Sequence, residues 1–248
     1  MKKNIIFIPA RTGSTRISNK NIQKLGSETL LSRKIKVCLK AKIGDVVVST
    51  NSYKIKKYVE KLGAKCPYIR PKKYSTSKAS MISAILDYLR FLKKNKLEIP
   101  NSITVCPVTN PFLLSSSIRS AYQTYSKKKF KSLNAVTNPD DHPFLFVKLK
   151  DKIKFNIYNV DGLRWTDLER TQDWPHTFIA SSALRISSSS YFLKYLNYKS
   201  PKFNQKTCDV KSATFFKVSR LESFDINNRF DLKLSRFLLA VNKKYLKI

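Results

Sequence analysis

The sequence predicts an α/β fold: a mostly parallel sheet with helices on both faces and a small inserted hairpin or arm region. Short runs of β-branched and aromatic residues alternate with longer segments of helical periodicity. Strands that alternate with helices in this way pair in parallel, because each helix returns the chain to the same edge of the sheet. The 248 residues, of which 42% are hydrophobic, suffice for one such domain with an appendage.

The first third of the chain shows this alternation most plainly. Residues 4–8 are a β-branched and aromatic run that ends at Pro9, which is typical of a buried strand. A helical pattern over residues 55–62 stops at Gly63, a residue type that commonly ends helices. In order, we expect a strand at 4–8, a helix over 30–39, a strand at 45–50, a helix over 55–62 and a strand at 66–69.

The remainder of the chain continues the pattern around one irregular stretch. Residues 144–155 alternate in polarity as a hairpin with its turn at Lys150 and Asp151, and residues 156–177 have no regular period. The other expected elements are strands at 103–106, 134–137 and 213–218 and helices over 79–94, 115–125 and 231–246.

Composition argues against several classes of protein. The net charge of +33 indicates a general affinity for polyanions. The basic residues are spread over the whole chain without a nucleic-acid-binding motif, so we expect no specific nucleic-acid partner. The four cysteines are widely spaced and predict neither a zinc site nor a redox motif. We find neither a membrane-spanning apolar run nor a signal peptide, and therefore expect a cytoplasmic protein without a membrane partner.

A polar loop follows the first strand, and the rest of the chain is organised around it. Gly13 allows the backbone to turn tightly or to approach a ligand closely. Arg11, Lys20 and Ser14 add fixed cations and a hydroxyl group, a combination that suits a polyphosphate. These residues alone leave a second interpretation open, namely a solvated basic loop in a lysine-rich protein.

The stretch I-P-A-R-x-G-S-x-R-x-x-x-K-N at residues 8–21 resembles the N-terminal signature of the acylneuraminate cytidylyltransferases, the CMP-sialic acid synthetases. The resemblance implies a fold like that of nucleotide-diphospho-sugar transferases, with the CTP triphosphate bound on this loop. It also assigns Arg11, Lys20 and Asp225 to catalysis: the two cations would neutralise charge on the leaving pyrophosphate, and Asp225 would orient the α-phosphate through a bound Mg²⁺. The CTP-binding residues that it implies are Arg11, Gly13, Ser14, Lys20 and Asn21 in the loop, and Arg70, Ala79 and Ser80 further along the chain.

Two further segments match the family in the same order along the chain. Arg70 precedes a proline, as in the family segment that receives the cytidine, although a loop followed by a helix N-cap is a structural explanation of the same residues. Residues 107–113 resemble a family element at the carboxyl edge of the sheet, where open α/β folds bind ligands. That resemblance places Thr109 and Asn110 at the sugar, whereas the arginine that the family has in place of Leu113 is missing here.

The residues that the resemblance assigns to the sugar in the inserted region are His142, Arg170 and Gln172. Arg170 would pair with the sugar carboxylate through two parallel hydrogen bonds, and Gln172 would hydrogen-bond hydroxyl or acetamido groups. A histidine beside a proline is more often structural, and the segment around Arg170 also reads as a surface loop or a dimer arm. The implied division is a nucleotide-binding core at 1–139, a sugar-binding and dimerisation insertion at 140–185, and the remaining core with the metal-site strand and C-terminal helix at 186–248.

Residues 222–231 resemble the metal-binding element of the family, in which two aspartates flank an apolar residue and hold magnesium. Asp225 is kept, the second ligand is Asn227, and Asp231 stands at the start of the last helix. Residues i and i+2 of a strand face the same side, which accounts for this spacing. The resemblance therefore implies a Mg²⁺ cofactor on Asp225 and Asn227, with weakened affinity because an asparagine adds no negative charge.

As a whole, the resemblance implies a cytidylyltransferase that activates a sialic-acid-like nonulosonic acid with CTP and releases pyrophosphate. Its partners would be CTP, an acidic nine-carbon sugar and a second copy of the chain in a homodimer. A cytidylyltransferase for another acidic sugar, such as Kdo, is the near alternative. Three departures from the family pattern leave open a catalytically weakened homologue that only binds nucleotide: Asn227, Leu113, and Ser181 in a stretch where the family often has an Asn-Gly pair. The net charge leaves open a polyanion-binding protein.

Overall fold

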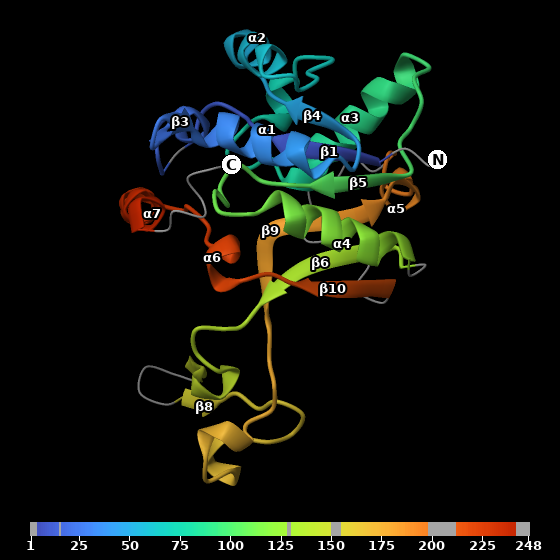
Figure 1. Ribbon diagram of the computed structural model, residues 1–248. Coiled ribbons are helices and arrows are strands. Elements are labelled where there is room, and N and C mark those ends of the chain that lie inside the picture. Colours follow the sequence, from blue (N-terminus) through green and yellow to red (C-terminus); the bar gives the residue numbers. More distant parts are fainter. Residues whose placement is uncertain (1–3, 15, 128–129, 150–154, 198–211, 242–248) are drawn as a thin grey trace.

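The computed structural model describes residues 4–14, 16–127, 130–149, 155–197 and 212–241 (Figure 1). Its centre is a six-stranded sheet in the order β10-β6-β9-β5-β1-β4. β9 runs antiparallel to both of its neighbours, and the other pairs are parallel, so the predicted mostly parallel sheet is confirmed. The strands are β1 (Asn4–Pro9), β4 (Asp45–Ser49), β5 (Ser102–Val105), β6 (Ser132–Thr137), β9 (Ile179–Ser188) and β10 (Ala213–Lys217).

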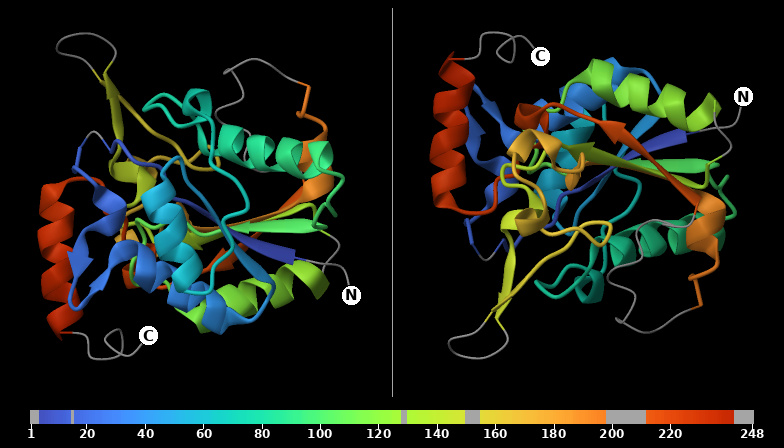
Figure 2. Two further views of the ribbon diagram at one scale, coloured as in Figure 1. Left: turned by 90° about the horizontal axis from the view of Figure 1, so that it is seen from above. Right: turned by 90° about the horizontal axis from the view of Figure 1, so that it is seen from below.

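Helices cover both faces of the sheet, as predicted, because successive side chains of β1 point to opposite faces. Ile6 and Ile8 lie in the core with α1, α2 and α4, whereas Ile5 and Phe7 lie in the core with α3 and α5 (Figure 2). The helices are α1 (Leu30–Ala41), α2 (Tyr53–Lys61), α3 (Met81–Lys94), α4 (Ser115–Lys127), α5 (Ser189–Leu193), α6 (Arg220–Ser223) and α7 (Arg229–Val241). None of the helices in the described ranges is long and apolar enough to cross a membrane.

One predicted strand is absent from the described chain. Residues 66–69 are not a strand, and only isolated bridges at Lys65 and Ile69 connect this stretch to the segment that contains β4. Pro67 lies between the two bridges and has no N–H group to donate to a strand ladder. The apolar run therefore follows the sheet without continuing its hydrogen-bond pattern.

The last helix does not cover a face of the sheet, which corrects the prediction. α7 lies beyond the carboxyl edge, against a small hairpin that the sequence did not predict, β2 (Lys24–Leu25) and β3 (Glu28–Thr29) (Figure 1). Gly26 in the hairpin turn has φ +65°, and a Cβ atom there would stand only 3.2 Å from Leu239 Cδ2. This close approach brings α7 beside the segment that follows β1.

Between β6 and β9 the described residues of 138–178 form an arm that projects beyond β10 (Figure 1). The predicted hairpin is present as β7 (Val147–Leu149) paired antiparallel with β8 (Phe155–Ile157). The predicted turn at Lys150 and Asp151 lies outside the described residues. Short 3₁₀ helices at Pro143–Leu145, Trp165–Asp167 and Thr171–Asp173 complete the arm.

Candidate active site

The loop after β1 lies at the carboxyl edge of the sheet, where the strand order reverses. β1 pairs with β4 on one side and with β5 on the other, and open α/β sheets bind ligands in the crevice at such a point. Gly13 has φ +77°, a left-handed conformation that its missing side chain permits. Arg11 Nη1 donates to the Gly13 carbonyl at 3.0 Å, so the guanidinium lies against the loop backbone. Ser14 follows and is partly exposed.

Two asparagines fix the backbone of this loop. Asn51, directly after β4, accepts from Thr12 N at 2.8 Å and donates to Thr12 Oγ1 at 2.9 Å. Asn21 Nδ2 donates to the Arg11 carbonyl at 2.9 Å, and the side chain is nearly buried. Asn21, expected at the CTP, thus holds the loop from beneath. Asn51 is a loop anchor that the sequence did not reveal beyond its place at a strand end.

Lys20 joins the loop to the segment that follows α6. Its Nζ donates to the Ile226 carbonyl at 2.7 Å, and Ile226 N donates to the Thr109 carbonyl at 2.9 Å. Three segments that are distant in sequence therefore meet at one point. Ile226 is fully buried, while Asp225 and Asn227 beside it are more exposed. Lys20 and Asp225, both predicted to be catalytic, are brought together here.

The electrostatic setting of Lys20 is a small cluster of opposite charges. Burial lowers the pKa of Lys20 below its ordinary value, while Asp225 and Asp231 raise it and Arg16 and Arg11 lower it further. The cluster holds three cations and two carboxylates. This excess of positive charge suits a polyanionic ligand such as a triphosphate.

Asp225 has the features of a metal ligand. Its Oδ1 is buried and has no hydrogen-bond partner among the described residues. An unpaired buried carboxylate oxygen is costly, and a divalent cation is a suitable partner for it. Asn227 does not present its oxygen alongside: Nδ2 donates to Asp225 Oδ2 at 3.3 Å, and Oδ1 accepts from Arg16 Nη1 at 3.4 Å. This arrangement differs from the expected pair of ligands.

The segment before α7 is held by a reciprocal cap. Asp231 Oδ2 accepts from the backbone N of Asn227 at 2.7 Å and of Asn228 at 2.9 Å, and Asn228 Oδ1 accepts from Asp231 N at 3.0 Å. The cap restrains Asn227 and Asn228, and residues 225–227 are not the strand that the spacing predicted. Within the described chain no three His, Cys, Asp or Glu side chains gather to hold a metal. A metal here would depend on few protein ligands and on phosphate oxygens.

Most of the chain matches a known protein family. Residues 5–159, from β1 into the arm, match the family described as cytidylyltransferase. The chain belongs to the cytidylyltransferase family. Its loop after β1, with Lys20, lies inside the matched range, and the Asp225 segment that Lys20 contacts lies outside it.

Individual relatives agree with this assignment. A pseudaminic acid cytidylyltransferase of Campylobacter jejuni is 32% identical over 244 residues, which are 97% of each chain. An N-acylneuraminate cytidylyltransferase of Streptococcus agalactiae is 25% identical over 92% of this cytidylyltransferase and 51% of that protein. A solved CMP:2-keto-3-deoxy-manno-octonic acid synthetase complexed with CTP superposes with a TM-score of 0.68 at 12% identity, covering 96% and 98% of the two chains. The family makes the chain a nucleotidyltransferase, and the superposition shows the fold.

Arg70 of this cytidylyltransferase is buried, although it was expected at the cytidine. Its side chain is 4% exposed, and its Nη2 and Nη1 donate to the carbonyls of Ser49 and, at 3.4 Å, of Tyr74. Burial lowers the pKa of the guanidinium. Arg70 thus ties the end of β4 to the loop that precedes α3.

The other two residues expected at the cytidine lie at the start of α3. Ser80 Oγ accepts from Ser83 N at 3.3 Å as an N-cap, so the helix begins at Met81, later than the predicted residue 79. Ala79 N donates to the Thr76 carbonyl at 3.1 Å. Ala79 and Ser80 are both partly exposed, and the structural interpretation as an N-cap is confirmed.

Asn110 supports the fold, which corrects its expected contact with the sugar. Its side chain is fully buried, and Nδ2 donates to the carbonyls of Ser223 and Phe224 at 3.2 and 3.1 Å. A fully buried amide with these partners does not reach a ligand. Thr109 beside it is partly exposed, and Leu113 is fully buried.

Two cations of α1 hold the same loop from below. Lys34 Nζ donates to the Asn110 carbonyl at 2.7 Å, and Arg33 Nε donates to the Pro111 carbonyl at 3.0 Å. Burial lowers the pKa of both cations. The sequence did not reveal either residue, because nothing local separates them from the many other basic residues.

The predicted sugar ligands of the arm lie apart from the loop after β1 of the same chain (Figure 1). Arg170 forms a two-point ion pair with Asp173, through Nε–Oδ2 at 2.9 Å and Nη2–Oδ1 at 3.1 Å. Both side chains are substantially exposed, and Gln172 between them is exposed as well. The guanidinium is therefore held in the geometry that a carboxylate needs, with an internal carboxylate as its present partner.

His142 is engaged at both ring nitrogens. Nδ1 accepts from Phe144 N at 3.2 Å, so Nε2 carries the proton that it donates to the Pro175 carbonyl at 2.8 Å. The ring packs against Phe144 and Trp174, with centroids 4.6 and 5.0 Å apart. These contacts agree with the structural interpretation of this histidine and stabilise the base of the arm.

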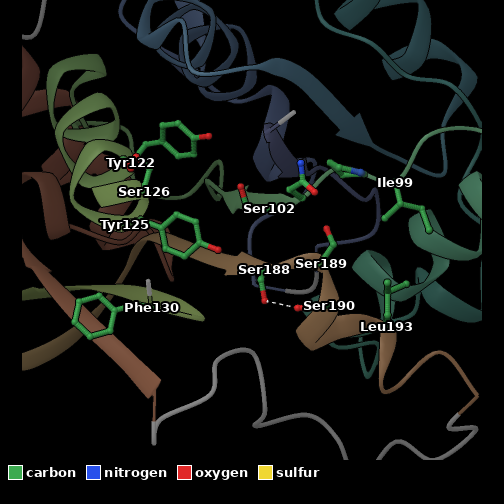
Figure 3. A pocket seen from close by; sticks show the side chains of 12 residues that line it. Ile99, Ser102, Tyr122, Tyr125, Ser126, Phe130, Ser188, Ser189, Ser190 and Leu193 are labelled. Carbon is green, nitrogen blue, oxygen red and sulfur yellow. Dashed lines mark hydrogen bonds between the residues drawn. The ribbon is translucent and has the colours of Figure 1, made fainter. Parts of the chain in front are cut away.

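A cavity of about 570 Å³ lies at the opposite edge of the sheet (Figure 3). Ser102 at the start of β5 and Ser188 at the end of antiparallel β9 line it, together with Tyr122, Tyr125 and Leu193. None of the described residues that line it is charged. The described lining therefore offers no cation to a triphosphate.

Proposed function

We propose that this chain transfers CMP from CTP to a nonulosonic acid, an acidic nine-carbon sugar, and releases pyrophosphate. One observation carries the proposal: Lys20 Nζ lies 2.7 Å from the Ile226 carbonyl, next to Asp225, whose Oδ1 has no hydrogen-bond partner among the described residues. A cation beside a carboxylate oxygen that can take a metal ion suits a triphosphate and its counterion. The pseudaminic acid, N-acylneuraminate and, at 29% identity over 123 residues, N,N'-diacetyllegionaminic acid enzymes among the relatives support this sugar class.

The proposed reaction is a displacement at the α-phosphorus of CTP. The anomeric hydroxyl oxygen of the sugar forms a bond to that phosphorus and loses its proton. The bond from the phosphorus to the oxygen that bridges to the β-phosphate breaks, and its electron pair leaves with pyrophosphate. Arg11 and Lys20 would bind the phosphate oxygens and neutralise the charge that grows on the leaving group.

We further propose Mg²⁺ as the cofactor. Asp225 would hold it through the buried Oδ1 that lacks another partner among the described residues. When bound, the ion would neutralise phosphate charge and orient the α-phosphate. Lys20, anchored on the Ile226 carbonyl, would bind the triphosphate from the side of the loop.

We also propose a homodimer in which the arm contacts the second chain. The arm projects from the sheet, and an exposed apolar group on a projecting element is typical of an interface (Figure 1). Sedimentation velocity of the wild-type chain tests this: we expect a dimer, and we expect Phe146→Asp to yield monomers. A monomeric wild-type chain would contradict it. The large apolar side chains of the arm that are about half exposed are Leu145, Phe146, Val147, Tyr158 and Phe178.

The decisive experiment is pyrophosphate release from CTP and Mg²⁺ with a panel of sialic, legionaminic, pseudaminic and Kdo sugars. ATP, GTP and UTP serve as nucleotide controls. We expect release with CTP and with one nonulosonic acid. If no sugar of the panel gave pyrophosphate release while CTP binding was demonstrated separately, the result would favour a homologue that only binds nucleotide. Absence of CTP binding would contradict the proposed function altogether.

A second candidate is a cytidylyltransferase for Kdo. The 3-deoxy-manno-octulosonate cytidylyltransferase of Rickettsia bellii is 40% identical over 60 residues, a higher local identity than that of the pseudaminic acid relative. Those 60 residues are only 24% of this chain, against 97% for the pseudaminic acid relative, so we place Kdo second. The sugar panel separates the two candidates directly.

A further inference from the structure

The outer face of α7 exposes three large apolar side chains to solvent. Phe230, Phe237 and Val241 are 70%, 63% and 57% exposed. Their spacing along the helix places them in one stripe. The opposite face, with Leu232 and Leu239, is buried against the rest of the protein. Every other described helix exposes at most one large apolar side chain, so the stripe marks α7 as an interaction surface.

Basic side chains flank the stripe. Arg229, Lys233 and Arg236 are all exposed, and the helical repeat places them on the same side of it. None of the three forms an ion pair with a carboxylate of the described residues. The acidic residue of α7, Asp231, accepts from two backbone N–H groups at the start of the helix. The exposed surface of α7 is therefore apolar and cationic, in a chain whose net charge is +33.

α7 lies at the rim of the molecule (Figure 1 and Figure 2). It packs on the β2–β3 hairpin, where Arg236 Nε also donates to the Lys24 carbonyl at 3.3 Å. The helix is thus attached to the protein along one side, and the exposed stripe lies on the other. Such a convex apolar stripe enters a fluid lipid interface without needing a groove of matching shape.

The combination of apolar and cationic groups favours the surface of an anionic membrane over other partners. Nucleic acids are bound through phosphate contacts, to which an aliphatic side chain such as Val241 adds nothing. A second copy of the chain would bring two cationic flanks into one contact, and the only carboxylate of α7 already caps the helix. Anionic headgroups and acyl chains together match both parts of the surface.

We propose that α7 docks the protein on anionic lipid membranes. Phe230, Phe237 and Val241 lie between the headgroups and the first acyl carbons, and the cationic flank contacts the anionic headgroups. The contact needs no membrane-spanning helix, because an amphipathic helix lies in the plane of the bilayer surface. The sequence-based expectation of no membrane partner considered only spanning runs and signal peptides. The proposal goes beyond the proposed function and does not depend on it.

The first experiment is co-sedimentation with vesicles of phosphatidylserine and phosphatidylcholine in equal parts. Because so basic a chain binds polyanions in general, the test compares variants of equal charge. We expect Phe237→Ser to weaken binding by about 10-fold, the order for keeping one large apolar side chain in water. Phe215→Ser is the matched control, since Phe215 is 57% exposed on β10. It should change binding by less than about 2-fold, and both variants should keep the wild-type melting temperature.

The second experiment places a fluorophore in the stripe. Phe237→Trp and Phe215→Trp differ only in the position of the added indole, so Trp165 and Trp174 give both variants the same background. On the anionic vesicles, we expect phosphatidylcholine with brominated acyl chains to quench Phe237→Trp at least about 2-fold more strongly than Phe215→Trp. Attraction by charge alone would hold the protein at the surface without bringing residue 237 to the acyl chains.

Three results would overturn the proposal. Vesicle binding that Phe237→Ser leaves unchanged, or equal quenching in the two tryptophan variants, would show only the general attraction of a basic chain. Weaker binding of Phe237→Ser to single-stranded RNA, with vesicle binding unchanged, would assign the stripe to nucleic acid. A smaller sedimentation coefficient of Phe237→Ser without vesicles would assign it to a second copy of the chain. None of these measurements involves CTP, so they leave the proposed function to its own test.

Discussion

The carboxyl edge of the sheet and the arm hold their polar side chains in opposite ways. At the edge, Lys20 reaches the Ile226 carbonyl across 206 residues of sequence, and Thr12 reaches Asn51 across 39. In the arm, Arg170 pairs with an aspartate three residues away. Contacts between distant segments hold the edge together, whereas Arg170 of the arm is held by a near neighbour, and an ion pair between Asp140 and Arg220 connects the base of the arm to α6.

From this difference we expect the edge to govern the chemistry of the reaction and the arm to govern the choice of substrate. A side chain at the edge holds several loops at once, so its loss is expected to disturb the nucleotide site and the fold together. A side chain of the arm, such as Arg170, is expected to change little beyond the arm. We therefore expect edge substitutions to act on CTP and turnover, and arm substitutions to act on the sugar.

Lys20→Met would remove a contact that joins two segments at the carboxyl edge, and it should have the largest effect on activity. It removes both the cation at the triphosphate and the contact to Ile226, so we expect kcat to fall by about 10²- to 10³-fold, as for other lost transition-state charges. Pyrophosphate release measures this. Lys24→Met, four residues away and exposed, is the control and should stay within about 2-fold of the wild type. Equal losses in both variants would contradict a specific role.

The pH dependence of Lys20 sharpens the same point. Burial lowers its pKa, and only the protonated form carries the charge that binds a triphosphate. We therefore expect kcat/KM to fall on the alkaline side at a pH below the ordinary lysine pKa of about 10.4. In Lys20→Arg the fall should move to higher pH. An unchanged alkaline limb in that variant would assign the titration to another group.

Arg70 tests whether an edge cation can be structural only. Arg70→Met would remove the guanidinium that the carbonyls of Ser49 and Tyr74 accept from, and the Ser49 carbonyl would keep Ala10 N as its remaining donor. We expect the free energy of unfolding to fall by about 3 kcal/mol, measured by urea denaturation. Arg70→Lys, which keeps the charge, should lose less. If Arg70→Met kept wild-type stability and only raised the KM for CTP, the result would support the predicted contact with the cytidine.

Lys34 gives a subtler test, because its effect depends on pH. Burial lowers the pKa of Lys34 in the folded state. Between that pKa and the unfolded value, the unfolded chain binds more protons, so the free energy of unfolding of the wild type rises with pH. Lys34→Met lacks this term. Its stability relative to the wild type should decline from neutral to alkaline pH in urea titrations, and a constant difference would contradict the assignment.

Much of the fold could be predicted because its signals are local. The strand at residues 4–8 was predicted from a run of β-branched and aromatic residues, and the helix end from Gly63. Each signal depends on a few neighbouring residues, and both agree with the structure. The composition of the loop likewise pointed to Lys20. The strand expected at 66–69 failed for an equally local reason, since Pro67 interrupts its hydrogen bonds.

The features of the site that the sequence did not predict depend on contacts between distant residues. The orientation of the Asn227 amide is set by Arg16, 211 residues earlier, and no local pattern links the two. No local pattern sets Lys34 apart from the other lysines, and the fold buries it beneath Asn110. The direction of the arm is likewise absent from the periodicity of residues 138–178, because the periodicity fixes faces of elements and not where a projecting hairpin lies.

Arg170→Gln should have the smallest effect on the fold. It changes the arm and leaves the carboxyl edge of the sheet as it is. An exposed i,i+3 ion pair contributes little, so we expect the free energy of unfolding to change by less than about 0.5 kcal/mol. If the guanidinium binds the sugar carboxylate, the KM for the sugar should rise about 10-fold while the KM for CTP stays unchanged. Arg164→Gln is the matched control, since Arg164 pairs with Asp167 in the same way. A rise in the KM for CTP, or equal effects in both variants, would show that the arm does not act on the sugar through Arg170.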